Sequence, residues 1–141
     1  AAAMAWVMET EGLCDWRWLE EYTAGYALYR DYVLGCSNGQ PKTPEWAEPI
    51  TGVSAETTRR LAREFATVKP ACLLAGWGPQ RATYGEQAAR ALMTLACLSG
   101  NVGLLGGGEV EPARALLESV LRENPNHLSV KIHLELLEWN L

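Results

Sequence analysis

The 141 residues of the chain include 48% hydrophobic and 21% charged side chains, with a formal net charge of −5. This balance excludes an intrinsically disordered chain and a collagen-like one, and the length suits one ordinary domain. Because the chain is acidic and has no run of more than two basic residues, we expect neither nucleic acid nor an anionic membrane surface as its partner.

Three short helices are predicted in the first quarter of the chain. The apolar residues 1–11 predict a helix that ends at the following glycine. Asp15 is a favourable N-cap for a second helix over 16–22, and residues 26–34 predict a further turn or two of helix closed by Gly35.

Two better marked helices follow. Thr43, Pro44 and Glu45 together form a strong helix start, and Pro49 limits this helix to about two turns. Ser54 caps the next helix, which has an apolar stripe on one side and arginines on the other. The stripe consists of Leu61, Ala62, Phe65 and Ala66.

The run Ala-Cys-Leu-Leu-Ala at 71–75 is short, uninterrupted and apolar, which is typical of a buried strand in an α/β sheet. A glycine loop follows, and Thr83 with Glu86 predicts a capping box for a helix to about Leu98 that is buried on every side. This order predicts an α/β fold, a mainly helical fragment of a nucleotide-binding-like domain with one clear strand. Since one strand cannot form a sheet, its partners are expected outside this chain.

A glycine triplet at 106–108 predicts a boundary between a first domain, 1–108, and a C-terminal helical hairpin, 109–141. The hairpin weakly resembles one tetratricopeptide repeat, and arrays of such repeats need about three units for stability. Residues 91–108 carry no charge, but their five glycines argue against a membrane-spanning helix.

The cysteines do not form a metal-binding pattern. Cys14, Cys36, Cys72 and Cys97 lie far apart, without a CxxC pair or a neighbouring histidine. A zinc site or an iron–sulfur cluster held by this chain is therefore not expected, and the cysteines are interpreted as small buried hydrophobic residues.

The loop after residue 75 is the best candidate for a binding site. Gly76 and Gly78 would let a ligand approach the backbone, and Arg81 offers the geometry that suits a phosphate. The dinucleotide-binding fingerprint is incomplete, since Arg81 occupies the position of its third glycine. Spacing alone leaves a phosphate site and an ordinary turn between strand and helix both open, and Trp77 is either a stacking platform or a packed side chain.

Several motifs in series resemble dimethyl sulfoxide reductase-type molybdopterin oxidoreductases. They are GWGPQR at 76–81, GEQ at 85–87 and LSGNVG at 98–103, preceded by KTPEWA at 42–47 and ITGV at 50–53. The resemblance covers about residues 1–108. It implies part of a catalytic subunit that binds a bis(molybdopterin guanine dinucleotide) molybdenum cofactor and transfers an oxygen atom to or from a small S-oxide or N-oxide.

In this family the matching loop lies against the pterin. The resemblance therefore implies cofactor contacts for Gly76, Trp77, Gln80 and Arg81, and backbone-permissive positions for Gly78 and Gly85. It also implies the remainder of a catalytic subunit, an iron–sulfur electron-transfer subunit and a membrane anchor subunit as partners. The family suggests a periplasmic or membrane-associated complex in anaerobic respiration.

Three departures from the family pattern limit what this chain is expected to do alone. It lacks a cluster-binding cysteine set, and no residue can be assigned as the molybdenum ligand. Between Gly25 and Asp31 it looks shorter than the family, as if a loop were deleted. We therefore expect no catalysis by this chain alone, and the alternatives are a protein-interaction module or a fragment without activity.

Overall fold

The computed structural model describes residues 1–76 and 78–104, in which six α-helices and one short 3-10 helix are the regular elements. The predicted domain boundary and the predicted hairpin at 109–141 lie outside these residues and stay predictions. The elements are α1 (Ala2–Thr10), α2 (Trp16–Tyr22), α3 (Tyr26–Leu34), α4 (Pro44–Thr51), α5 (Ala55–Thr67), η1 (Gly78–Arg81) and α6 (Glu86–Leu98).

Side-chain caps begin three of these helices, as predicted. Asp15 accepts a hydrogen bond from the backbone N–H of Trp18 at the start of α2. The Thr43 hydroxyl accepts from the backbone N–H of Trp46 at the start of α4, and the Ser54 hydroxyl accepts from that of Thr57 at the start of α5. The nitrogen-to-oxygen distances are 3.1 and 3.2 Å. Each cap satisfies an amide that the helix itself cannot bond, so the local sequence fixes these boundaries.

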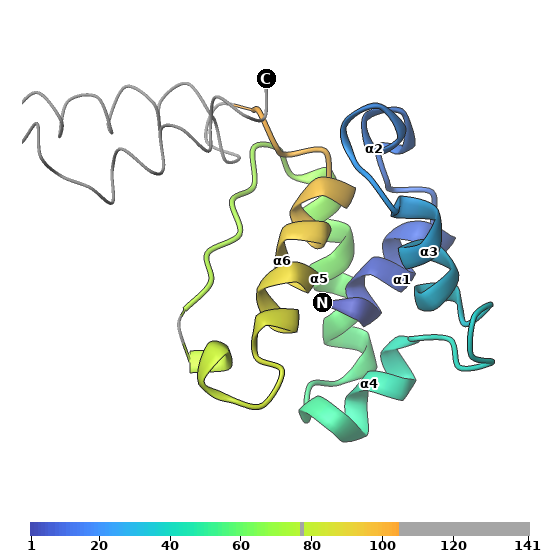
Figure 1. Ribbon diagram of the computed structural model, residues 1–141, viewed down its shortest axis with the longest axis vertical. Helices are drawn as coiled ribbons and strands as arrows, with labels where there is room; N and C mark the ends of the chain where they lie inside the picture. The colour runs from blue at the N-terminus through green and yellow to red at the C-terminus, as the bar shows by residue number, and fades with distance from the viewer. Residues whose placement is uncertain (77, 105–141) are drawn as a thin grey trace, which may run out of the picture.

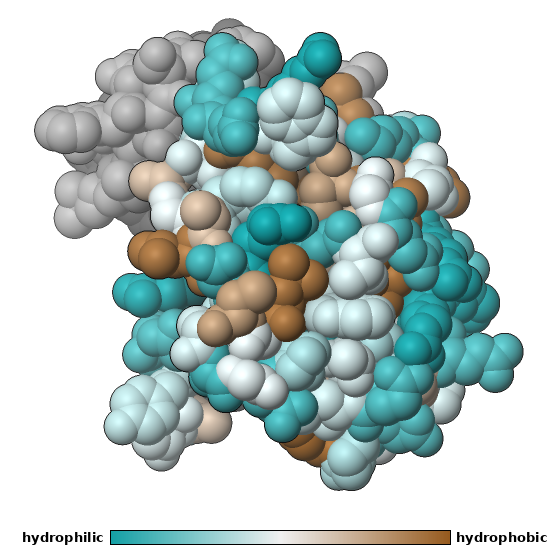
Figure 2. Space-filling model, turned by 90° about the vertical axis from the view of Figure 1, so that its right-hand side faces the viewer, coloured by the Kyte–Doolittle hydropathy of each residue, from teal (hydrophilic) through white to brown (hydrophobic). Residues whose placement is uncertain are grey.

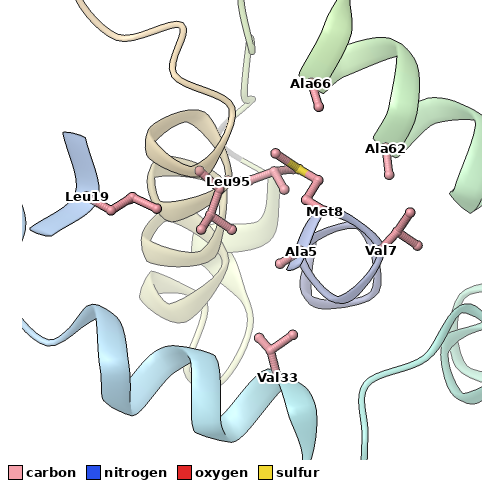
Figure 3. Close-up of a cluster of buried hydrophobic side chains, with 9 residues drawn as sticks. Ala5, Val7, Met8, Leu19, Val33, Ala62, Ala66 and Leu95 are labelled. Atoms are coloured by element: carbon pink, nitrogen blue, oxygen red, sulfur yellow. The ribbon is translucent and has the colours of Figure 1, made fainter. Parts of the chain in front are cut away.

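Helix α1 is the centre of the core. It packs against α3, α4, α5 and α6, and Figure 1 shows α6 and α3 on its two sides. Its residues Val7 and Met8 are fully buried. In Figure 3, which looks nearly along α1, Met8 points into the space between α5 and α6. A helix that is apolar all round belongs in a core, which explains this central position.

The predicted α/β fold with one clear strand is wrong, because the described residues contain no strand. Residues 71–76 are extended, but they pair with no other extended segment in that part of the chain. Leu74 is 90% exposed and Cys72 is exposed as well. An apolar run becomes a strand only where a neighbour accepts and donates the ladder hydrogen bonds, and none of the described segments does so here.

Two details of the predicted α6 are also corrected. The helix begins after Gly85, which provides no side-chain cap, so the capping box of Thr83 and Glu86 does not form. Its burial is one-sided: Leu95 and Leu98 are buried, whereas Met93 is 63% exposed.

The interpretation of the cysteines as buried residues is corrected, because none of the four is fully buried. Cys36 and Cys72 are exposed, while Cys14 and Cys97 are half-buried, and all four are free thiols. Burial, followed by the nearby Glu9 carboxylate, raises the pKa of the Cys14 thiol.

The described residues hold no group of three or more side chains able to bind a metal ion. None of their helices is long and apolar enough to cross a membrane.

Candidate cofactor-binding loop

Asn101 anchors the segment that leads into the glycine loop, which we define as residues 76–85. The Asn101 side chain is completely buried. Its Oδ1 accepts a hydrogen bond from the backbone N–H of Ala71 at 2.9 Å, and its Nδ2 donates to the carbonyl oxygen of Phe65 at 3.3 Å. Nδ2 also lies 2.9 Å from the Ser99 hydroxyl oxygen. One side chain thus ties the end of α5 and the extended segment to the turn after α6.

Within the glycine loop the chain turns through backbone hydrogen bonds between residues three positions apart. The N–H of Ala82 donates to the carbonyl of Pro79 at 3.3 Å, and the N–H of Gly85 donates to the carbonyl of Ala82 at 2.9 Å. Tyr84 between them has a φ of +59°, an uncommon value for a residue with a side chain. These contacts place η1 directly before α6, as Figure 1 shows.

Gly76 and Gly78 have no packing role among the described residues. A Cβ atom added at either position would meet no heavy atom within 4 Å, and neither glycine has a positive φ. Gly35 is the contrast, because its φ is +83° and an added Cβ would lie 2.5 Å from the backbone nitrogen of Pro41. The backbone at 76 and 78 is therefore open to close approach from outside.

Arg81 brings positive charge to this open backbone. It is exposed, and within the described residues it forms no ion pair, unlike Arg59 and Arg63. A guanidinium without a carboxylate partner can form two parallel hydrogen bonds to a phosphate. An open backbone beside such a group fits a phosphate-bearing cofactor.

The start of α6 offers less to an anion than its sequence predicts. The amides of Gln87 and Ala88 already donate to the carbonyls of Tyr84 and Gly85, at 3.0 and 3.1 Å. Gly85 is buried at the junction of loop and helix, with an ordinary helical φ of −60°.

The structure describes some of the predicted site residues more fully than others. Gly76, Gly78, Arg81 and Gly85 lie on the same short loop. The backbone of Gln80 belongs to η1, and Trp77 lies outside the described residues. Sequence reasoning assigned no role to Asn101. The available signal was an asparagine directly after Gly100 in the turn that follows the C-cap of α6, where its short amide can reach backbone groups.

The comparisons with known proteins identify relatives for most of the chain, although no family model matches it. The probable dimethyl sulfoxide reductase chain YnfF of Escherichia coli is 45% identical over 120 residues, which covers 76% of this chain and 15% of the relative. Trimethylamine-N-oxide reductase of Haemophilus influenzae is 48% identical over 105 residues, covering 74% of this chain and 13% of the relative. The dimethyl sulfoxide/trimethylamine N-oxide reductase of Rhodobacter capsulatus is 45% identical over 105 residues.

This aligned part of the chain belongs to the dimethyl sulfoxide reductase-type family of oxidoreductases, and the resemblance predicted from the sequence motifs is confirmed. The chain spans 12–15% of the length of the curated relatives that it matches.

The relatives fall into two groups by the length of the alignment. Those named only as dimethyl sulfoxide reductases align over 117–120 residues, whereas those whose names include trimethylamine N-oxide align over 105–106. The share of this chain that is covered is 74–76% in both groups. The first group therefore has additional residues within the shared segment, and the second aligns almost without gaps.

Proposed function

We propose that this chain contributes to cofactor binding in a molybdenum-dependent oxidoreductase that transfers an oxygen atom from S-oxides or N-oxides. The observation that carries the proposal is the glycine loop. Gly76 and Gly78 leave the backbone open, and Arg81 adds a guanidinium without an ion pair in the described part of the chain. The family relationship explains why such a loop is present.

A molybdenum cofactor in general follows from the family, and we assign its bis(molybdopterin guanine dinucleotide) form to this loop. Gly76 and Gly78 let the cofactor approach the backbone, Gly85 is the backbone-permissive position where the loop joins α6, and Arg81 pairs with a phosphate group. Trp77 and Gln80 complete the proposed contacts. When bound, the molybdenum centre supplies the two-electron chemistry of oxygen-atom transfer. The chain's own residues bind and orient the cofactor, and none is assigned a catalytic role.

The remaining partners are part of the same proposal. The chain acts together with the remainder of a catalytic subunit, which receives electrons from an iron–sulfur subunit held at the membrane by an anchor subunit. The small fraction of each relative that the chain spans supports this dependence on a larger subunit.

The alignment lengths favour an N-oxide as the substrate. The relatives that align almost without gaps all include trimethylamine N-oxide in their names. The extra residues of the other group would fall between Gly25 and Asp31, where this chain looks short. We expect the complete subunit to reduce trimethylamine N-oxide faster than dimethyl sulfoxide, measured with reduced methyl viologen. The opposite preference would remove the argument from alignment length.

The cofactor proposal is tested by producing the chain in an anaerobic host that makes the molybdenum cofactor. Elemental mass spectrometry should find molybdenum at near one atom per chain, together with a bound pterin. Arg81→Gln should lower this content, and Arg60→Gln is the matched control, because Arg60 is an exposed arginine paired with Glu64 outside the loop. Equal molybdenum content in the two variants would contradict the assignment, and a folded chain without molybdenum would favour an interaction module or a fragment without activity.

A further inference from the structure

A groove lies between α3 and α6, the two helices that flank α1 in Figure 1. Two cavities of about 330 and 630 Å³ lie along it, and Tyr29, Arg90 and Thr94 line both of them. Gln87 lines the larger cavity. The groove uses none of the glycine-loop residues, so it is separate from the proposed cofactor site.

The hydroxyl group of Tyr29 has no hydrogen-bond partner in the described part of the chain, although its oxygen is buried. Buried polar atoms of native proteins almost always have a partner, so this hydroxyl needs an explanation. Burial, with a smaller contribution from Tyr32, raises the pKa of Tyr29 to about 12. The hydroxyl is therefore protonated at neutral pH and able to donate.

Arg90, which is exposed, is the one charged side chain among the described residues that lines the groove, and the Glu9 carboxylate lies close enough to contribute to the raised pKa of Tyr29. Arg90 lines both cavities, and no aspartate or glutamate among the described residues lines either of them. Arg90 also forms no ion pair there, whereas Arg30 pairs with Glu9. The neighbouring cavity between α2 and α3 has mixed charge, since Glu20, Arg30 and Asp31 line it.

We propose that this groove binds a small oxyanion, either a phosphate or a carboxylate group of a ligand. Arg90 provides the guanidinium, and the Tyr29 hydroxyl provides the second donor. The Arg90 guanidinium on α6 and the Tyr29 hydroxyl on α3 are donors from the two sides of the groove, and charge-assisted hydrogen bonds to an oxyanion are the strong ones. Gln87 and Thr94 add polar atoms beside the bound group.

Figure 2 shows the face of the molecule over α2 and α3, where small apolar patches are scattered among polar side chains. That outer face offers no single large apolar surface.

The test is a titration of the isotope-labelled 141-residue chain with inorganic phosphate at constant ionic strength, followed by NMR. The backbone signals of Tyr29, Arg90 and Thr94 should shift and saturate. Arg90→Gln should weaken binding at least about tenfold, since it removes the charged partner. Tyr29→Phe should weaken binding to a smaller extent. Arg60→Gln, which removes an exposed arginine on α5, should titrate like the unchanged chain.

A parallel titration with acetate separates the two sources of the oxyanion. Tighter binding of phosphate assigns the groove to a phosphorylated ligand, and tighter binding of acetate assigns it to an acidic side chain of a polypeptide. Absence of saturation with both anions would overturn the proposal, as would unchanged binding in Arg90→Gln. The spectra of the variants show directly whether each is folded. Neither titration involves molybdenum, so failure here leaves the proposed cofactor function untouched.

Discussion

The helices around α1 and the segment of residues 69–85 satisfy their polar groups in opposite ways. Around α1, caps and helical hydrogen bonds use the backbone groups, and apolar side chains fill the centre. At 71–76 the described hydrogen bonds include one backbone amide, that of Ala71, and its partner is the side chain of Asn101. The first region satisfies its backbone groups within itself, while the second presents free backbone and Arg81 to an outside group.

Truncation of the central helix should have the largest effect on folding. Met8→Ala removes a fully buried side chain at the contact of α1 with α5 and α6, and such truncations cost about 2–5 kcal/mol. Met93→Ala is the matched control, because Met93 is 63% exposed on α6. Urea unfolding measures both free energies. An equal loss in the two variants would contradict the assignment of α1 to the core.

A pair of glycine substitutions compares the two regions directly. Gly35→Ala places a Cβ 2.5 Å from the nitrogen of Pro41 in a left-handed backbone, which alone costs about 1–2 kcal/mol. Gly78→Ala meets open space, so it should be neutral or stabilise by up to about 1 kcal/mol. Thermal unfolding ranks the two variants. If Gly78→Ala lowers the melting temperature as much as Gly35→Ala, Gly78 has a packing role within the fold, which would contradict the open backbone at this position.

Removal of the Asn101 side chain should loosen the glycine loop while leaving α1 packed. Asn101→Ala leaves the Ala71 amide and the Phe65 carbonyl without their partner, a loss of about 1–3 kcal/mol for a buried group. The Ala71 amide should then exchange with solvent faster than the amides of α1. Gln87→Ala, an exposed polar residue on α6, provides the control. Unchanged exchange at Ala71 would show that Asn101 does not hold this segment.

The smallest expected effect concerns the ion pair of Glu11 and Arg63, whose Glu11 Oε2 to Arg63 Nε distance is 2.8 Å. The Arg63 hydrogen bond lowers the pKa of Glu11 below its ordinary value of 4.5. The pair therefore stabilises the fold above pH 4.5, and this contribution disappears as the pH falls through the lowered pKa. Because the Arg63 and Glu11 side chains remain 54% and 34% exposed to water, the contribution is small.

The measurement compares the melting temperatures of the unchanged chain and Glu11→Gln at pH 7 and pH 3. The unchanged chain should melt slightly higher at pH 7, and the difference should be smaller at pH 3. Glu20→Gln removes an exposed carboxylate that has no ion pair in the described part of the chain, and it should show no such convergence. A difference that grows toward low pH has the wrong sign for this pair.

The sequence predicts the first region well because its signals are local. Asp15, Thr43 and Ser54 are caps whose partners lie three residues away, so helix boundaries follow from short windows. Prediction failed where the outcome depends on distant groups. The run at 71–75 has the composition of a strand, but no described segment pairs with it. The position of Asn101 between α5 and the extended segment spans 30 residues or more, and no local pattern encodes it.

For the candidate site, motif resemblance identified the family and the loop, but not how the loop is held. It also gave no hint of the groove at Tyr29 and Arg90. That groove requires residues of two helices that are far apart in sequence and meet only after both pack on α1. Such sites become visible only from the three-dimensional arrangement.

The most direct test of the difference between the two regions is amide hydrogen exchange with and without the molybdenum cofactor. Chain from a host that makes the cofactor is compared with chain from a host that cannot. We predict strong protection of α1 and α5 in both samples, and stronger protection of residues 72–85 in the cofactor-loaded sample than in the empty one. Equal exchange at 72–85 in a sample that contains molybdenum would contradict it, because the cofactor would then be bound elsewhere.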